Sequence, residues 1–103
     1  MKSEIKALRA KLEGETGTAD WALLAAHARA DHLIVVGEEL GLLDAATAVA
    51  NNDADRVGGW IDDALLTKPD AGLQAEYAQA ESLFFQFVIV APFVMAQQVK
   101  LSS

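Results

Sequence analysis

The chain has 103 residues, no cysteine and a formal net charge of −7, and these properties exclude several classes of protein. A chain of this length buries roughly two-thirds of its unfolded surface, so we expect a single domain over residues 1–103, with residues 1–13 as a leading helix at its periphery. Without cysteine there is no disulfide framework and no Cys-based zinc site, and a charged N-terminus without an apolar signal segment favours the cytoplasm. Residues 12–103 carry a charge of −10, which argues against a nucleic-acid-binding protein.

The N-terminal half is predicted to alternate helices with one short strand. Apolar residues recur at helical spacing over residues 3–13, which predicts an amphipathic helix. A second helix is expected to begin at an N-cap on Thr18 and to close near residue 32. The β-branched run 33–36 predicts a strand, and the alanine-rich segment 42–50 predicts a further helix.

Two more helices are predicted in the C-terminal half, each after an aspartate cap. Asp53 precedes a helix whose apolar residues, Trp60 among them, follow one stripe up to residue 65. The Gly58–Gly59 pair inside it indicates either close packing or a local break, because glycine lowers helix stability. Residues 65–68 are expected to be extended, and Asp70 to cap the last helix.

The segment 83–96 has fourteen residues, one polar side chain and no charge. It is shorter than the roughly 20 apolar residues of a membrane-spanning helix, so we expect no membrane contact. Its aromatic and β-branched residues favour a strand buried on both faces. Pro92 lacks an amide donor and belongs at a strand end, an edge or a bulge. No Asn-Gly or Gly-Gly turn follows, so we expect the chain to continue in the same direction after a bend. These elements together predict an α+β fold, with four to five helices packed on a small two- or three-stranded sheet.

Polar residues with the chemistry of a catalytic or metal site are few. His27, Asp31 and His32 have metal-ligand side chains, but His27 and Asp31 share a helix face while His32 does not, so we expect neither a metal site nor another cofactor. The acidic pairs at 38–39 and 62–63 are sequence neighbours that do not face each other, which argues against paired catalytic carboxylates. The patterns of nucleotide-binding loops are absent from the sequence.

Four aromatic residues form another candidate set, for which core packing is favoured over a ligand pocket or partner surface. These residues are Trp21, Trp60, Tyr77 and Phe93. With the histidine cluster included, the candidate ligand or partner surface comprises His27, Asp31, His32, Trp21, Trp60 and Phe93.

A family pattern extends over residues 12–98. The residues that carry it are Glu15, Thr16, Trp21, 33–36, Leu40, Leu42, Ala46, Ala50, Asp53, Trp60 and the Val-Ala-Pro segment 90–97, which ends in Gln97. The chain thereby resembles a family of small bacterial proteins described only as domain of unknown function 2288. It departs from that family's pattern at Phe93, where tryptophan is usual, and at Gly41, where aspartate is favoured and for which Asp44 is a substitute nearby. The resemblance implies a compact cytoplasmic domain and supplies no mechanism.

Two hypotheses for the function follow. The first is a non-catalytic interaction module, self-associating as a homodimer or binding another protein, because 52% of the residues are hydrophobic and residues 83–99 carry no charge to protect a sheet edge. The second is a small-ligand-binding protein or enzyme with a polar cleft around His27, Asp31, His32 and Glu38.

Overall fold

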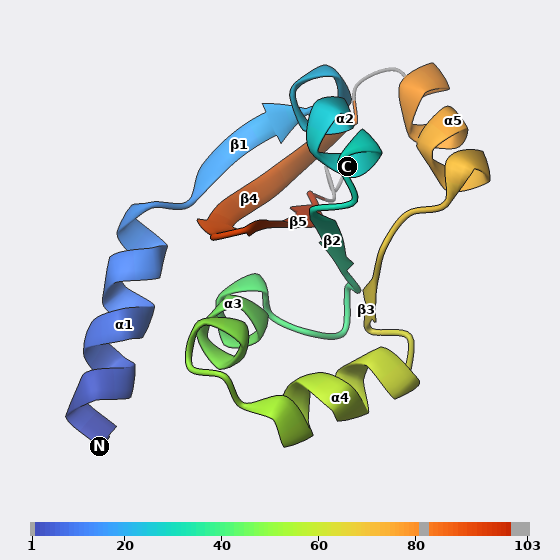
Figure 1. Ribbon diagram of the computed structural model, residues 1–103. Coiled ribbons are helices and arrows are strands. Elements are labelled where there is room, and N and C mark those ends of the chain that lie inside the picture. The colour runs from blue at the N-terminus through green and yellow to red at the C-terminus, as the bar shows by residue number, and fades with distance from the viewer. Residues whose placement is uncertain (1, 81–82, 100–103) are drawn as a thin grey trace.

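The computed structural model describes residues 2–80 and 83–99, and within these ranges it contains five helices and five strands (Figure 1). The predicted α+β class is confirmed, but the sheet has five strands instead of two or three. No helix in the described part of the chain is long and apolar enough to cross a membrane. In chain order the elements are α1 (Lys2–Gly14), β1 (Gly17–Asp20), α2 (Trp21–Arg29), β2 (Leu33–Val36), α3 (Leu42–Ala50), α4 (Ala54–Asp62), β3 (Leu66–Thr67), α5 (Ala71–Gln79), β4 (Phe84–Val90) and β5 (Phe93–Gln98).

The strands lie in the order β1-β4-β5-β2-β3, so the last two strands of the chain occupy the interior of the sheet. β4 and β5 pair in antiparallel fashion, with Val88 opposite Met95 and Val90 opposite Phe93. The expectation that the chain continues in one direction past Pro92 is therefore wrong, because Ala91 and Pro92 form a two-residue turn between the strands. Both turn residues are exposed, and this position leaves Pro92 outside the hydrogen-bonded ladder.

The two strands missing from the predicted sheet are its short edges. β1 has four residues and pairs with β4, whereas β3 has two residues and pairs with β2. Thr18 lies inside β1 and does not cap the following helix, contrary to our expectation. The cap of α2 is Asp20, whose side chain accepts a hydrogen bond from the Leu23 amide at 3.1 Å.

Two hydrophobic clusters lie on opposite faces of the sheet. On one face, Val36, Val88, Val90 and Met95 pack with residues of α1 and α3. On the other face, buried residues of α2 pack on the sheet. This second cluster includes Trp21, Leu24, Ala28, Leu33, Phe85 and Val94. β4 thus contributes buried residues to both faces, as predicted for segment 83–96, although Phe84 and Ile89 stay exposed.

The helices differ in how deeply they are buried. In Figure 1, α3 and α4 lie on one side of the sheet and α2 on the other, with α5 packed against α2. α3 has five buried residues, whereas neither α4 nor α5 has one. α4 ends at Asp62, so the apolar stripe predicted up to residue 65 is helical only in part. Within the helix, Val57 and Trp60 are half-buried and Ile61 is exposed. A helix with an apolar stripe that is not covered leaves apolar surface beside the core.

Candidate binding groove

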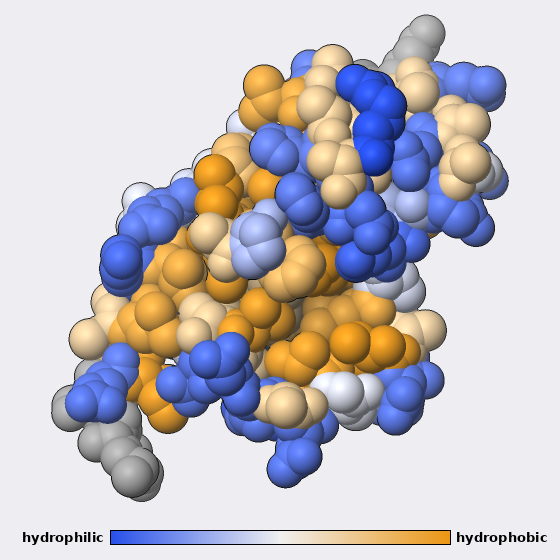
Figure 2. All heavy atoms as spheres, viewed as in Figure 1, coloured by the Kyte–Doolittle hydropathy of each residue, from blue (hydrophilic) through white to orange (hydrophobic). Residues whose placement is uncertain are grey.

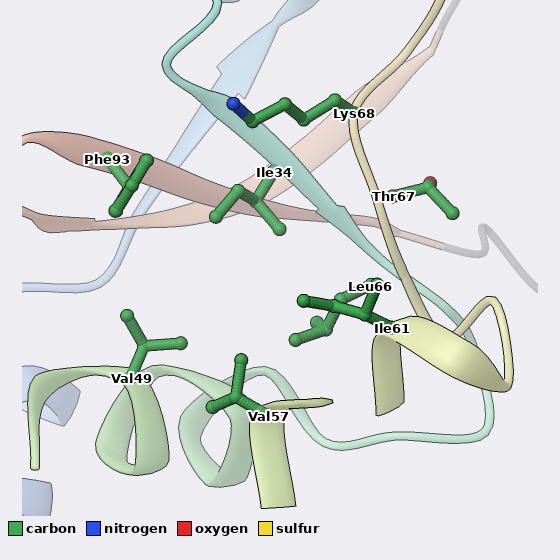
Figure 3. Close-up of a pocket in the computed structure, with 8 residues that line it drawn as sticks. All are labelled: Ile34, Val49, Val57, Ile61, Leu66, Thr67, Lys68 and Phe93. Atoms are coloured by element: carbon green, nitrogen blue, oxygen red, sulfur yellow. The ribbon is translucent and has the colours of Figure 1, made fainter. Parts of the chain in front are cut away.

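An apolar groove lies between α4 and the sheet, and its volume is about 340 Å³. Figure 2 shows hydrophobic side chains gathered over this part of the molecule, and Figure 3 shows the side chains that line the groove. They come from five different segments of the chain. The lining residues are Ile34, Val49, Val57, Ile61, Leu66, Thr67, Lys68 and Phe93.

The sheet forms one wall of the groove. Ile34 pairs with Met95 across the parallel β2–β5 ladder and therefore lies on the same face as that buried residue. Ile34 is half-buried, whereas Val36, Val88 and Val90 on the same face are buried. The unfilled volume above Ile34 explains why this residue keeps solvent contact.

The opposite wall is formed by α4, because Val57 and Ile61 are four residues apart and lie on one helix face. The exposed fraction of Ile61 is 56%, which is high for an isoleucine on the apolar face of a helix. Figure 3 shows both side chains on the groove side of α4, with Val49 from α3 beside Val57. The groove thus exposes a continuous apolar surface to solvent.

Lys68 is the one charged residue of the lining. Its Nζ lies 3.1 Å from Asp31 Oδ2 and 5.9 Å from the centre of the Phe93 ring. Both partners of this ion pair are exposed, so the pair contributes little to stability. The lining contains no histidine and no carboxylate. Such a surface has the composition of a binding site and lacks the paired acid and base of hydrolytic or proton-transfer catalysis.

The histidine cluster lies around the end of α2. α2 ends at Arg29, and Asp31 follows in the left-handed conformation with φ 65°, so His27 and Asp31 do not share a helix face as we expected. His27, Asp31 and His32 are all exposed. Across residues 2–80 and 83–99, no three histidine, aspartate or glutamate side chains are grouped closely enough to hold a metal ion. Glu38 is likewise exposed, in the connection between β2 and α3.

The aromatic candidates separate into three environments. Trp21 is buried, with its ring centre 5.1 Å from that of Tyr77 and 6.2 Å from that of Phe85. Trp60 is half-buried with the Arg56 guanidinium 5.5 Å from its ring, and Phe93 lines the groove. Of the six predicted surface residues, only Phe93 belongs to the groove. Asp31 is connected to it through its ion pair with Lys68.

Comparison with known proteins adds the family. The model of a family described as "Protein of unknown function (DUF2288)" matches residues 7–98. The chain belongs to the DUF2288 family. It is also similar to the NMR solution structure of PA1075 from Pseudomonas aeruginosa, with a TM-score of 0.79 and 28% sequence identity over 94% of this chain and 90% of that chain. A search among curated proteins found no match.

The structure explains the end of the DUF2288 pattern in this chain. Residues 90–97 contain the turn between β4 and β5 and most of β5. Gln97 Nε2 donates hydrogen bonds to the carbonyl oxygen of Gly37, at 2.8 Å, and to that of Leu40. The motif thus connects the central strand to the start of the segment that leads into α3.

The departure at Gly41 also has a local explanation. Gly41 is the N-cap of α3 and has no side chain to cap the helix. A Cβ placed on Gly41 would lie 2.9 Å from Asp44 Oδ2, so the Asp44 carboxylate occupies the space that a side chain at position 41 would need. Asp44 also accepts a hydrogen bond from Arg9 of α1. An acidic group near the N-terminus of α3 is therefore retained, and it is engaged in an ion pair between helices.

Proposed function

We propose that this DUF2288 protein is a non-catalytic interaction module that self-associates as a two-fold dimer through the apolar groove. The observation that carries the proposal is the exposed Ile61, which lies at the groove on a helix with no buried residue. Contiguous exposed apolar surface of this kind is typical of interaction sites. A second copy of the same chain is the occupant that the following features favour.

A two-fold interface uses the same surface patch on both subunits, so the patch must contain both a projecting group and a surface that receives it. α4 meets this requirement, because the exposed Ile61 and the groove wall at Val57 lie on one helix face. In the proposed dimer, Ile61 of each subunit packs against Ile34 and Phe93 of the other. Burying the exposed part of each isoleucine contributes roughly 1 kcal/mol. Because stable interfaces bury about 1,000 Å² or more, the contact would extend along α4 beyond the groove.

The charge of the chain also favours the apolar groove as the dimer interface. The chain carries a net charge of −7, so two copies repel each other unless they meet where few acidic groups face each other. The groove lining contains no acidic residue and one lysine, Lys68. Association through the groove lining therefore brings no pair of acidic side chains together within that lining.

Light scattering after size-exclusion chromatography tests the proposal on the wild type, Ile61→Glu and Leu23→Glu. Leu23 is a matched control, because it is an exposed apolar helix residue outside the groove lining, with an exposed fraction of 60%. We expect a dimer for the wild type and for Leu23→Glu, and a monomer for Ile61→Glu. A wild-type mass near the 11.0 kDa monomer at all concentrations would overturn self-association. Dissociation by Leu23→Glu alone would assign the interface to another surface.

A further experiment addresses other occupants of the groove. Decanoate combines an apolar tail with one carboxylate and could contact Lys68, so chemical-shift mapping with decanoate tests small-ligand binding directly. A monomeric wild type that binds decanoate saturably at Val57 and Ile61 would contradict the dimer and support the small-ligand hypothesis. Absence of saturable shifts in a dimeric wild type is the expected result.

A further inference from the structure

α4 is attached to the rest of the molecule mainly through its neighbours in sequence. It packs chiefly against α3, which precedes it, and β3, which follows it, and none of its residues is buried. Its polar and charged contacts are local, because Asp53 caps its own helix and the Arg56 guanidinium lies over the Trp60 ring. A helix with so few buried apolar contacts is among the elements that move at the lowest cost in free energy.

Both joints of α4 are anchored, and both contain a residue in the left-handed conformation. Asn52 precedes the helix with φ 56°, and Ala64 follows it with φ 60°. The Asp53 amide donates to the last turn of α3 at 2.9 Å, and the Leu65 carbonyl accepts from Gly37, beside β2, at 2.8 Å. Because the two ends of α4 are held in this way, the motion left to the helix is a roll about the line between its joints.

Ala64 opposes the present position of α4. Asparagine adopts left-handed angles readily, as Asn52 does, whereas alanine is strained there because its Cβ approaches the following carbonyl oxygen. A roll of α4 that changes the backbone angles of Ala64 relieves this strain. Glycine at the same position would not be strained, since it has no Cβ.

The apolar groove favours a roll toward the sheet. Ile34 and Phe93 face α4 across about 340 Å³ that no described side chain fills, and Figure 3 shows Val57 and Ile61 on the groove side of α4. Apolar groups separated by such a gap make no contact with each other, and the exposed part of Ile61 stays in water. A roll that brings Ile61 onto Ile34 removes both unfavourable features without a partner.

We propose that α4 is a lid that closes this groove within one subunit. In the closed position, Ile61 packs on Ile34 of its own chain and the apolar surface is hidden. In the open position described above, the same surface can receive a second copy. The competition with a second copy, though not the closure itself, rests on the function proposed above. Dimerisation selects the open position, so a change that favours one position disfavours the other.

Disulfide trapping distinguishes closure within a chain from contact between two chains. The chain has no cysteine, so the double variant Ile34→Cys/Ile61→Cys reports one contact, since a disulfide needs Cβ atoms about 4 Å apart. The protein is diluted until sedimentation velocity shows monomers, oxidised glutathione is added, and the products are separated by mass without reductant. We expect a disulfide within the monomer. Leu23→Cys/Ile34→Cys is the matched control and should give none, because α2 covers the opposite face of the sheet.

Ala64→Gly tests the role of the joint. Glycine removes the strain of the open position, so this change should slow disulfide formation within the double variant severalfold. In the chain without cysteines it should tighten the dimer severalfold. Asn52→Gly is the matched control, because it alters the joint residue that tolerates its left-handed angles, and it should leave both values nearly unchanged.

The outcomes separate the lid from the dimer. Absence of a disulfide within the diluted monomer, or the same yield from the Leu23 pair, would overturn the lid. Covalent dimers alone, from a wild type that self-associates, would overturn the lid and leave the dimer in place. A disulfide within a chain whose wild type is always monomeric would support the lid and overturn the dimer. The pair Ile61→Cys/Phe93→Cys spans the same groove and replaces the first pair if Ile34→Cys unfolds the chain.

Discussion

Gln97 is the residue whose side chain connects the family motif to the rest of the fold. It is half-buried and donates to two backbone carbonyl groups, Gly37 and Leu40, that precede α3. Neither a shorter nor an apolar side chain at this position can reach both oxygens with two N–H donors. The glutamine is therefore explained by structure, and it needs no role in binding or catalysis.

Replacement of Gln97 by methionine should lower the free energy of unfolding by about 1–3 kcal/mol, because two carbonyl oxygens lose their hydrogen-bond donor. Gln98→Met is the matched control, since Gln98 is the exposed neighbour on the same strand. That control should change stability by less than about 0.5 kcal/mol. Chemical denaturation measures both values. Equal losses in the two variants would show that the Gln97 hydrogen bonds do not stabilise the fold.

Tyr77 is the one tyrosine of the chain, so its ionisation can be followed by absorbance without overlap from another tyrosine. Burial raises the pKa of its phenol above the ordinary value of 10.0, and the negative charge of Glu76 adds to the increase. The unfolded chain therefore loses this proton at lower pH than the folded chain. The stability contributed by neutral Tyr77 is present below pH 10.0 and is lost as the pH rises through the higher folded-state pKa.

An absorbance titration should show tyrosinate appearing above pH 10.0 in the folded protein and at lower pH in denaturant. Glu76→Gln should lower the pKa of Tyr77 and leave it above the ordinary value, because burial is the larger cause. Glu13→Gln, on α1, is a charge-matched control that should have no effect. A folded-state pKa equal to that in denaturant would contradict the packing of Tyr77 against Trp21 and Phe85.

At the scale of elements, the glycine pair in α4 has neither of the two explanations that we considered. The helix is continuous from Ala54 to Asp62, so Gly58 and Gly59 do not mark a break. A Cβ added to either residue would have no atom within 4 Å, so close packing does not require glycine there. The pair instead lowers the intrinsic stability of the helix that forms one wall of the groove.

Gly59→Ala should therefore raise the free energy of unfolding by about 0.5–1 kcal/mol, since alanine restricts the unfolded chain and favours the helix. Gly17→Ala provides the contrast, because a Cβ on Gly17 would lie 3.0 Å from Cε1 of the Phe87 ring. We expect Gly17→Ala to be neutral or destabilising. Thermal unfolding of the two variants checks the difference. A loss of stability in Gly59→Ala would mean that α4 needs the flexibility of glycine.

The elements that could be predicted from the sequence are those specified by their own residues. The strand predicted over 33–36 and the helix predicted over 42–50 are confirmed. The β-branched residues of the first and the alanines of the second favour these structures on their own. β1 and β3 are short, and they become strands by pairing with β4 and β2 rather than through their composition. The Ala91–Pro92 turn was missed because it lacks the glycine and asparagine of common hairpin turns.

The groove could not be predicted for a related reason. Its lining comes from β2, α3, α4, β5 and the segment at β3, and six of its eight residues are apolar. The six apolar residues have the same sequence spacing as core residues, so the sequence pattern predicts that all six are buried. Ile61 is exposed because no element within residues 2–80 and 83–99 covers that part of α4, which is a property of the tertiary arrangement.

At the scale of the whole molecule, the proposed dimer must form between two chains that each carry a charge of −7. This repulsion acts over distances much larger than the contact itself, whereas the apolar groove acts only on contact. Added salt therefore weakens the repulsion between the two chains and has little effect on the apolar contact. The groove lining itself contains few charges whose interactions salt could weaken, because Lys68 is its one charged residue.

Raising the salt concentration from about 0.01 M to about 0.15 M shortens the screening length from about 30 Å to about 8 Å. We therefore expect the dimer to become tighter over this range and to change little at higher concentrations. Sedimentation velocity at a series of protein concentrations measures the dissociation constant at each salt concentration. Weaker association in added salt would indicate that opposite charges hold the subunits together, and it would move the interface away from the apolar groove to a surface with paired acidic and basic residues.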